Sequence, residues 1–477
     1  MKYALIIIAA TVIIFIGILI FNAIRVTAKA RKLTAPKELV SESKQKEYCE
    51  KLGKMIRCET VSVKDSYDDT EFAKLRKTVG ELFPAVHKAA EKMTFGSDCW
   101  IYKIEGKDKN RNIMLMSHHD VAPVSGEWKH PPFCGEIYDS AVWGRGTVDT
   151  KTPLFAEFEA LEELLNEGFV PECNLYIGSS HNEEIAGDGI PLALEYFKAH
   201  GIEFETVLDE GGAIIDPPLA GMKCKCAMLA VHEKGRRTLE CTASQGNTHQ
   251  GLAANTNTPV ARMADFISEV NSKNIFIRRL YPEVRAMFEG LCPYLPFTMR
   301  ILFANLWCFG GLLKTLMPKI NPQAGAMVGT SCSFNEISGS SKNKSCTAKA
   351  FLRCVNDSDL ESDIKALKKV AEKYGIEITD GDENEYHTPA DMSQKGFAYT
   401  RECVAEIFPD VASAAFILPA GTDARHLSGI CRCAIRFAPI DIDKQQFASV
   451  HSENENISVK AVGNAVAFYK HYIKNYK

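Results

Sequence analysis

The sequence predicts an α/β fold, with a mainly parallel sheet covered by helices and one apolar helix in front of it. Two observations lead to this prediction. Short apolar, strand-like runs alternate with amphipathic stretches through the body of the chain, and such alternation is typical of parallel sheets with helical crossovers. Ahead of the body, residues 3–24 form an almost unbroken apolar run.

The composition is that of a folded globular protein. Apolar residues make up 46% of the 477 residues and charged residues 24%, which excludes extended disorder. The 56 Lys and Arg residues nearly balance 60 Asp and Glu residues, for a net charge of −4. Without a broad cationic field, nucleic acid is not an expected partner.

The N-terminal run is long enough to cross a membrane. A helix of about 20 apolar residues spans the hydrocarbon core, whereas the apolar part of a secretory signal has about 7–15 residues. The run fits a single transmembrane anchor over residues 3–24, followed by a linker over residues 25–47. Val26-Thr27-Ala28 leaves a weak cleavage site as the alternative.

The charges beside this run favour the cytoplasmic face for the body. One basic residue precedes the run and four follow it closely: Lys2, then Arg25, Lys29, Arg31 and Lys32. Positively charged flanks tend to stay in the cytoplasm.

The cysteines point weakly to the same side. The 16 cysteines include no CxxC pair, and we expect residues such as Cys308, Cys354 and Cys403 to be reduced core residues because their surroundings are apolar.

Three strand-like runs, Ile113–Met116, Leu175–Gly178 and Thr206–Leu208, are candidates for neighbouring strands. Between the first two, the apolar residues of Pro153–Asn166 recur on one helical face. Thr152 is placed to cap this helix. In such sheets ligands bind beyond the carboxyl ends of the strands.

Residue types that bind metals cluster after these strands and in two loops. They are His118, Asp120, Asp149, Glu183, Glu184, Asp209 and His451. Taken singly, each has an ordinary explanation, since an acidic pair is usually a solvated turn and a lone histidine is usually a hydrogen-bonded core residue. Their joint recurrence at strand ends is what indicates a metal site.

The number of these residues favours two ions rather than one. Two histidines and three carboxylates are too many for one tetrahedral ion that keeps an open position. They suit two ions about 3.5–4 Å apart that share one carboxylate. Imidazole and carboxylate ligands indicate zinc, with cobalt or manganese as alternatives.

These residues resemble the co-catalytic zinc peptidase family of aminoacylase-1, succinyl-diaminopimelate desuccinylase and glutamate carboxypeptidase. The family's His-x-Asp, Gly-Arg-Gly-x-x-Asp, Glu-Glu, acidic strand end and late His occur here in order, from about Tyr48 to the C-terminus. The N-terminal apolar segment and an apolar insertion at Phe288–Met317 are most similar to the branch of vacuolar carboxypeptidase S and the N-fatty-acyl-amino-acid hydrolases.

The resemblance implies a catalytic domain in two parts, residues 48–233 and 381–477. A smaller α/β lid, residues 234–380, would be inserted between them, and some relatives dimerise through this lid. Glu233-Lys234-Gly235 would open the lid, and Phe351-Leu352-Arg353 resembles its closing strand.

The resemblance also implies a set of metal ligands. His118, Asp149 and Asp209 would bind one zinc ion. Asp149 would bridge to a second ion, which Glu184 and His451 would complete.

Three residues would act in catalysis. Asp120 would orient the ligand imidazole, and Glu183 would be the general base. The Glu183 carboxylate would be free of metal, beside the metal-bound carboxylate of Glu184. His249 would be the lid histidine that stabilises the oxyanion, although its surroundings, Gly246-Asn247-Thr248-His249-Gln250, depart from the family's usual Gly-His-Ser.

Three further residues would contact substrate. Arg425, in Gly-Thr-Asp-Ala-Arg, would hold the free carboxylate of the substrate, a task that suits a planar guanidinium. A structural ion pair in a surface turn is the alternative for Arg425. Asn343 and Arg353 resemble substrate-contacting residues of the lid.

The expected activity is hydrolysis of the amide bond next to a free carboxylate in peptides or N-acyl amino acids. A general dipeptidase would use the same motifs. A non-catalytic receptor or scaffold on this fold would be expected to have lost ligands or the base, and all are present here.

The insertion Phe288–Met317 is not expected to be a second span, because Pro293 and Pro296 interrupt it. Packing within the lid is the simplest interpretation. An apolar wall for an acyl group and a shallow membrane contact are the alternatives.

Overall fold

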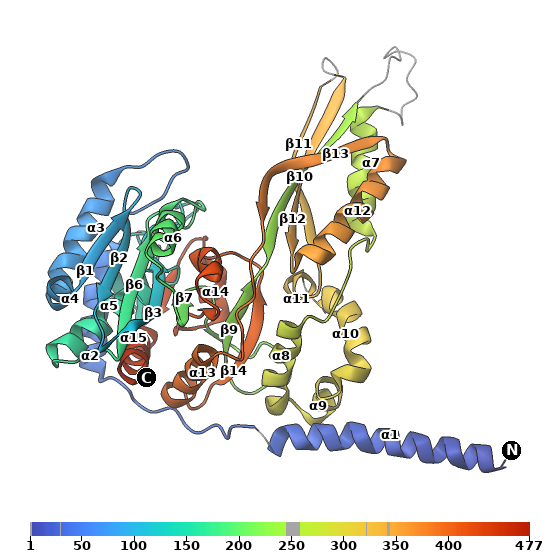
Figure 1. Cartoon of the computed structure of the whole chain (residues 1–477), viewed down its shortest axis with the longest axis horizontal. Coiled ribbons are helices and arrows are strands. Elements are labelled where there is room, and N and C mark those ends of the chain that lie inside the picture. The colour runs from blue at the N-terminus through green and yellow to red at the C-terminus, as the bar shows by residue number, and fades with distance from the viewer. Residues whose placement is uncertain (1, 29, 245–257, 321, 341–343) are drawn as a thin grey trace.

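A computed structural model describes residues 2–28, 30–244, 258–320, 322–340 and 344–477. Figure 1 shows an α/β body, a second and narrower sheet that rises beside it, and a long N-terminal helix α1 (Lys2–Ala28) that runs along one side of the molecule. The α/β class and the N-terminal apolar helix are therefore confirmed.

The largest sheet carries the strand ends that the sequence singled out. Its strands, in spatial order, are β1 (Glu91–Phe95), β2 (Cys99–Ile104), β6 (Cys173–Ser180), β3 (Asp108–His118), β7 (Thr206–Asp209), β15 (Ala434–Arg436), β9 (Cys226–Glu233), β8 (Ile214–Ile215) and β16 (Asp441–Ile442), with β14 (Ala412–Leu418) beside β9. The central strands β6, β3, β7 and β15 are parallel. Antiparallel pairs flank them at β1–β2, β2–β6, β15–β9 and β8–β9, so the sheet is mixed.

Helices cover both faces of this sheet. On one face lie α2 (Glu42–Ile56), α3 (Asp69–Leu82), α4 (Pro84–Ala89), α5 (Lys151–Asn166), α13 (Lys395–Ile407) and α15 (Val459–Asn475). The other face packs against α6 (Gly189–Ala199) and the 3-10 helix η3 (Asp423–Gly429). Successive residues of β3 alternate between the two cores, Leu115 in the first and Met114 and Met116 in the second, as a strand buried on both faces requires.

The predicted strands and helix lie within β3, β6, β7 and α5, but the predicted helix cap is wrong. Thr150 rather than Thr152 precedes the helix, and its side chain makes no capping bond. The loop after β5 turns directly into α5, with the Lys151 amide bonded to the Gly146 carbonyl. Thr152 therefore lies inside the first turn, and its hydroxyl donates to the Thr147 carbonyl.

The second sheet is antiparallel throughout. Its order is β11 (Ser331–Ser340), β12 (Ser345–Cys354), β10 (Gly235–Ser244) and β13 (Ile376–Glu385), and α7 (Pro259–Ser272) and α12 (Asp357–Lys373) pack on it with a core of their own. We call this unit the upper sheet. It falls in the region expected to be the lid.

A small third sheet supports the loops beside the site. It contains β17 (Asn456–Ser458), β5 (Ala141–Trp143) and β4 (Glu136–Tyr138). The short helix α14 (Lys444–Ser449) precedes β17, and a capping box at Asp443 fixes its start.

The apolar insertion forms three helices that pack on the main sheet, not within the lid as expected. They are α8 (Pro282–Leu291), α9 (Phe297–Phe303) and α10 (Leu306–Ile320), with η2 (Cys292–Tyr294) after α8 and α11 (Pro322–Ala326) after α10. Their core includes Met228 of β9 and Ala414 of β14. The reason is that α8 lies directly against β14, where Gly290 permits close approach to the strand backbone.

Two features of this region bear on membranes. By length and composition, α1 could cross a bilayer, and a signal sequence would pass the same test. The helices α9 and α10 are long and apolar enough to cross only as a pair, and they meet at 97°. Cys308, expected in the core, is exposed on α10, whereas Cys354 and Cys403 are buried as expected.

His387 should make the stability of the fold depend on pH. It lies after β13, where the chain returns from the upper sheet to the body, and it is 6% exposed. Burial lowers its pKa from 6.5 to about 4, and Arg425 and Arg436 add to this shift while Glu233 opposes it. The folded state therefore favours neutral His387. As the pH falls from 6.5 towards 4, His387 is protonated in the unfolded state but not in the folded state, and the free energy of unfolding decreases.

We expect wild type to lose about 2 kcal/mol more unfolding free energy than His387→Gln between about pH 7 and about pH 5. Urea titrations of both proteins at the two pH values measure this difference. Equal losses in the two proteins would contradict it.

Candidate functional site

Three neighbouring parallel strands bring their acidic and imidazole residues to one edge of the sheet. His118 is the last residue of β3 and pairs with Ser180, the last residue of β6. Asp209 ends β7 on the other side of β3. Since parallel strands end at the same edge, residues more than 90 positions apart in sequence converge there.

Asp149 lies between the two histidines. One of its carboxylate oxygens is 3.0 Å from His118 Nε2, and the other is 3.0 Å from His451 Nε2. His451 Nε2 is also 2.9 Å from Glu184 Oε2. Donor atoms of His118, Asp149 and Glu184 all lie within 4.8 Å of one another. We call His118, Asp149, Glu184 and His451 the ligand cluster.

Asp209 lies at the same edge, but its hydrogen bonds run to the backbone. Its two carboxylate oxygens accept from the amides of Glu210 at 2.9 Å and Ala424 at 2.8 Å. These bonds fix both oxygens and leave each a lone pair. The side chain is fully buried, and burial raises its pKa.

Asp120 holds the ligand cluster and the Glu183-Glu184 pair together. Its Oδ1 is 3.2 Å from His118 Nδ1 and accepts from the Glu183 amide, while its Oδ2 accepts from the Glu184 amide and from the Ser62 hydroxyl at 2.6 Å. Burial would raise the Asp120 pKa, but the bonds to His118 and Ser62 lower it below its usual range. Asp120 therefore stays ionised and orients both partners.

Glu183 lies beside the ligand cluster without bonding to it. Its Oε1 is 3.6 Å from Arg425 Nη1. Burial raises the pKa of the Glu183 carboxyl well above its usual range, and neighbouring Asp423 and Asp120 add to this shift while His118 opposes it. A carboxylate of raised pKa can accept a proton near neutral pH.

The residues of this site fit divalent metal ions. Two ring nitrogens and several carboxylates converge where His118 is buried and Asp149 and Glu184 are partly buried, so unpaired negative charge there is costly. Hydrogen bonds that His451 donates to the carboxylates of Asp149 and Glu184 raise its pKa to about 10, a measure of how strongly this position attracts positive charge. The nitrogen and oxygen donors suit zinc, cobalt and manganese alike.

Glu455 positions the loop that carries Asp149, a role the sequence analysis missed. Its Oε1 accepts from the amides of Gly146, Val148 and Asp149, and its Oε2 lies 2.6 Å from Arg145. Both charged side chains are fully buried. The sequence contains one indication of this role, because Glu455 is an acidic residue four positions after the candidate ligand His451.

Arg425 is buried and aimed at the same edge of the sheet. Its Nη1 donates to the Thr422 carbonyl at 2.8 Å, and its Nε has no hydrogen-bond partner among the described residues. Glu233 holds the loop by accepting from the Thr422 amide and hydroxyl, and it also pairs with Arg436. Neither Glu233 nor Arg436 was recognised from the sequence as a support of this loop.

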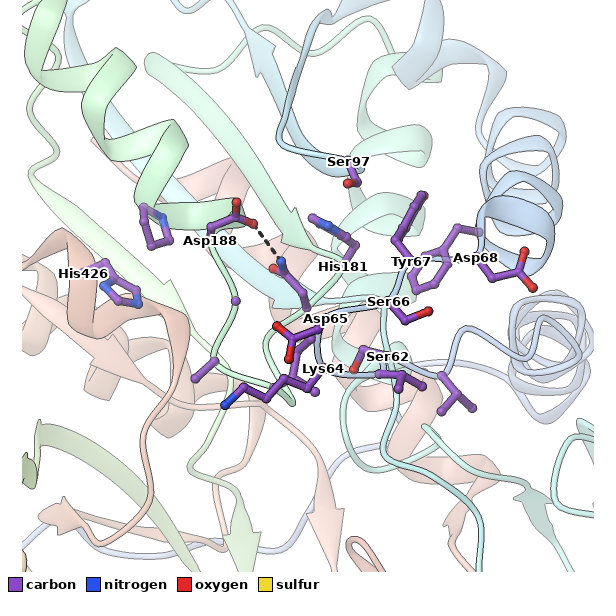
Figure 2. A pocket seen from close by; sticks show the side chains of 18 of the residues that line it. Ser62, Lys64, Asp65, Ser66, Tyr67, Asp68, Ser97, His181, Asp188 and His426 are labelled. Carbon is purple, nitrogen blue, oxygen red and sulfur yellow. Dashed lines mark hydrogen bonds between the residues drawn. The ribbon is translucent and has the colours of Figure 1, made fainter. Parts of the chain in front are cut away.

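A cavity of about 680 Å³ opens beside these residues. Figure 2 shows its wall, with Ser62, His181 and His426 among the side chains around it. Ser62 is the residue that bonds Asp120, and His426 follows Arg425. Neither the ligand cluster nor Glu183 or Arg425 lines this cavity, although Asn182 and His426, their neighbours in sequence, do.

The remaining expected site residues lie in the upper sheet or outside the described residues. Arg353 lies in β12, opposite Arg236 of β10, at the end of the upper sheet nearest the body. His249 and Asn343 fall outside the described residues. Trp307 does not line the cavity, and its ring instead packs against Phe15 of α1.

The chain is similar to known proteins over most of its length. Residues 114–475 match the model of peptidase family M20/M25/M40. The chain is 27% identical over 481 residues to the N-fatty-acyl-amino acid synthase/hydrolase PM20D1 of Xenopus tropicalis, covering 97% of this chain and 93% of that protein. It is 28% identical over 488 residues to the probable carboxypeptidase S-like 2 of Dictyostelium discoideum, covering 97% and 92%.

Solved structures share the fold. An M20 family metallo-carboxypeptidase from Sulfolobus solfataricus superposes with a TM-score of 0.61 at 18% identity, covering 90% of this chain and 98% of that chain. A dinuclear metal binding peptidase of the M20 family from Bacillus subtilis gives a TM-score of 0.57 at 12% identity, covering 90% and 98%.

Replacing Glu455 should loosen the loop of Asp149. Glu455→Gln leaves the buried Arg145 without its charge partner, and we expect it to lower the free energy of unfolding by about 3–5 kcal/mol. Zinc affinity should fall with it, because Asp149 loses its fixed position. Urea unfolding and zinc titration measure the two effects.

Glu453→Gln is the matched control, because Glu453 is exposed and bonds only to the Ser452 hydroxyl among the described residues. A Glu455→Gln protein as stable as this control would contradict the role of Glu455.

Proposed function

The chain belongs to peptidase family M20/M25/M40 and is a metal-dependent hydrolase, and we propose that it cleaves the amide bond next to a free carboxylate. The observation that carries this proposal is the position of Glu183, between the ligand cluster and a buried arginine whose Nε makes no hydrogen bond among the described residues. A base, a metal site and a carboxylate-binding group that lie together at one edge of the sheet suit an N-acyl amino acid or a peptide C-terminus.

We assign the ligands of two zinc ions. His118, Asp149 and Asp209 would hold one ion, and Asp149, Glu184 and His451 the other. The two carboxylate oxygens of Asp149 support this assignment, since each already faces one of the two histidines. Two bound ions lower the pKa of a shared water and polarise the substrate carbonyl.

Glu183 would move the proton. It accepts a proton from the attacking water as the water oxygen bonds to the carbonyl carbon, and it delivers that proton to the amide nitrogen as the carbon–nitrogen bond breaks. The products are a carboxylic acid and a free amine. Asp120 supports this step by fixing the Glu183 backbone and the His118 ring.

Arg425 would bind the free carboxylate of the substrate. Burial gives its guanidinium a fixed position, and a planar guanidinium can bind a carboxylate through two parallel N–H groups. Its distance of 3.6 Å from Glu183 supports binding of that carboxylate close to the bond to be cut. His249, Asn343 and Arg353 remain proposed contacts from the lid, residues 234–380, with His249 serving the oxyanion.

The proposal has two candidate substrate classes. The first is N-fatty-acyl amino acids and longer peptides with a free C-terminus, which the relatives named above favour. A dipeptide is the second candidate, and it is favoured by Asp65 and Asp188 in the cavity wall, since carboxylates there would suit a free ammonium group.

We also propose a place and an assembly for the protein. The helix α1 would anchor it in a membrane with the body on the cytoplasmic face, as the basic residues after the helix favour. A homodimer through the upper sheet is supported by β11, an edge strand of ten residues that exposes Ile337.

Glu183→Gln tests the proposed reaction. We expect kcat to fall by about 10²–10⁴-fold while two zinc ions per chain remain bound, because Glu183 is not a proposed ligand. Glu184→Gln should instead lose zinc. Metal content by mass spectrometry and release of free amine, from an N-oleoyl amino acid and a dipeptide offered together, measure both effects and reveal the preferred substrate.

Unchanged turnover in Glu183→Gln would overturn the assignment of the base. Absence of turnover of any such amide by the zinc-loaded wild type would favour a non-catalytic receptor on this fold.

Arg425→Lys tests the carboxylate site. Lysine keeps the charge but loses the paired N–H groups, so KM for an N-acyl amino acid should rise about tenfold to a hundredfold. The same substrate with its carboxylate converted to an amide should be a poor substrate for wild type and should be affected little by Arg425→Lys. An equal rise in KM for the two substrates would contradict carboxylate recognition.

A further inference from the structure

The helix α1 packs against the insertion instead of projecting alone from the body. In its second half, Leu19 and Ala23 are buried, and Phe15 packs edge-to-face on Trp307 with ring centroids 5.9 Å apart. Arg300 in the middle of α9 bonds to Thr27 in the last turn of α1. The contact therefore extends over about three turns of α1.

The polar atoms inside this contact satisfy one another. Asn305, between α9 and α10, is fully buried. Its amide nitrogen donates to the Leu19 carbonyl at 3.1 Å and the Ile301 carbonyl at 2.8 Å. Its amide oxygen accepts from Asn22 at 2.8 Å and from the Trp307 indole at 3.2 Å. Paired polar groups of this kind are what a hydrocarbon environment requires.

The helices beside α1 expose apolar side chains. Trp307 is 61% exposed, Leu312 51% and Phe297 43%. The 13 residues 301–313 contain no charged side chain, and Arg300 and Lys314 flank them. Contiguous exposed apolar surface of this kind is unusual on a soluble protein and marks a contact with another apolar phase.

The arrangement in space places this surface on one side of the molecule. Figure 1 shows α1 passing below α9 and the lower end of α10, with the main sheet and the upper sheet on the opposite side. The 97° bend between α9 and α10 then leads the chain back towards the upper sheet. The segment Phe297–Ile320, which we call the elbow, therefore approaches α1 and leaves again on the same side.

We propose that the elbow inserts beside α1 into the membrane leaflet nearest the body, where lipid acyl chains cover its exposed apolar face. This inference rests on the proposed anchoring by α1. Two of the four hydrogen bonds of the fully buried Asn305 side chain go to α1, and their loss would leave buried polar atoms half satisfied, so the proposal includes α1 as a retained part of the folded protein and not a cleaved leader.

The elbow also fixes the body relative to the membrane. Directly after α1, Arg31 donates to the carbonyls of Val411, Pro409 and Ala405 at the end of α13 and the start of β14. The chain leaving α1 is thus bonded to the body at once. Two attachments, the elbow and this segment, restrict rotation of the body about α1.

Trp307 provides the test. Full-length, zinc-loaded protein is placed in phosphatidylcholine vesicles whose acyl chains carry bromine either near the headgroup or near the chain end. We expect bromine near the headgroup to quench tryptophan fluorescence more strongly, because the elbow enters from one side and turns back. Trp307→Phe, which keeps a ring against Phe15, should lose most of the quenching.

Trp128→Phe is the matched control. Trp128 is partly exposed, and its ring lies beside Arg145 in the catalytic body. Its replacement should leave the quenching unchanged. Equal quenching of wild type and Trp307→Phe would overturn the proposal, as would a stable dimer that buries Trp307 and excludes the lipid.

Cys308 offers a second measurement that needs no change in the elbow. It is the one exposed cysteine among the 16, and it follows Trp307. In vesicles we expect a charged, membrane-impermeant maleimide to label it about tenfold more slowly than a cysteine introduced by Ser362→Cys, since Ser362 is exposed on α12. Similar labelling rates would contradict insertion.

Failure of this inference and failure of the proposed function are distinguishable. Hydrolysis of a short, water-soluble N-acyl amino acid reports on the site alone, and Trp307→Phe should leave it unchanged. Lipid quenching through Trp307 without any hydrolysis would reject the function and keep the inserted elbow. A membrane-bound protein whose N-terminal peptide begins after α1 would reject both the anchor and the elbow.

Discussion

The Glu455 carboxylate is the interaction on which the arrangement of the site depends. It accepts from the loop amides of Gly146, Val148 and Asp149 and pairs with Arg145 where water cannot reach. Because Glu455 follows His451 by four residues, one carboxylate fixes both the Asp149 loop and the segment that carries His451. A buried pair of this kind is costly unless every lone pair is used, and here the loop amides use them.

Asp120 does the same for the other half of the site. It accepts from the amides of Glu183 and Glu184 and faces the His118 ring. Glu233 in turn fixes the loop of Arg425 through Thr422. Three buried carboxylates that do not face the substrate thus hold the groups that do, and the negative charge gathered at this edge suits a pair of divalent ions.

A buried polar side chain also organises the N-terminal region. Asn305 bonds to Leu19 and Asn22 of α1 and to Ile301 and Trp307 of the elbow, and these bonds join α1 to the helical insertion. The chain after α1 is bonded to the body through Arg31, which ties α1 to the catalytic body.

The sequence by itself determined the α/β class, the N-terminal apolar helix and the residues at the strand ends, because alternation and strand-terminal motifs are local patterns. Tertiary structure decided the rest. The position of Asp149 between two histidines and the supporting bonds of Glu455 and Glu233 join segments that are remote in sequence. The antiparallel edges of the sheet and the contact between α1 and the elbow depend on packing that no local period encodes. Hydrogen-bond partners and burial are fixed only when those segments meet, and for that reason Thr152 and Cys308 were placed wrongly from the sequence.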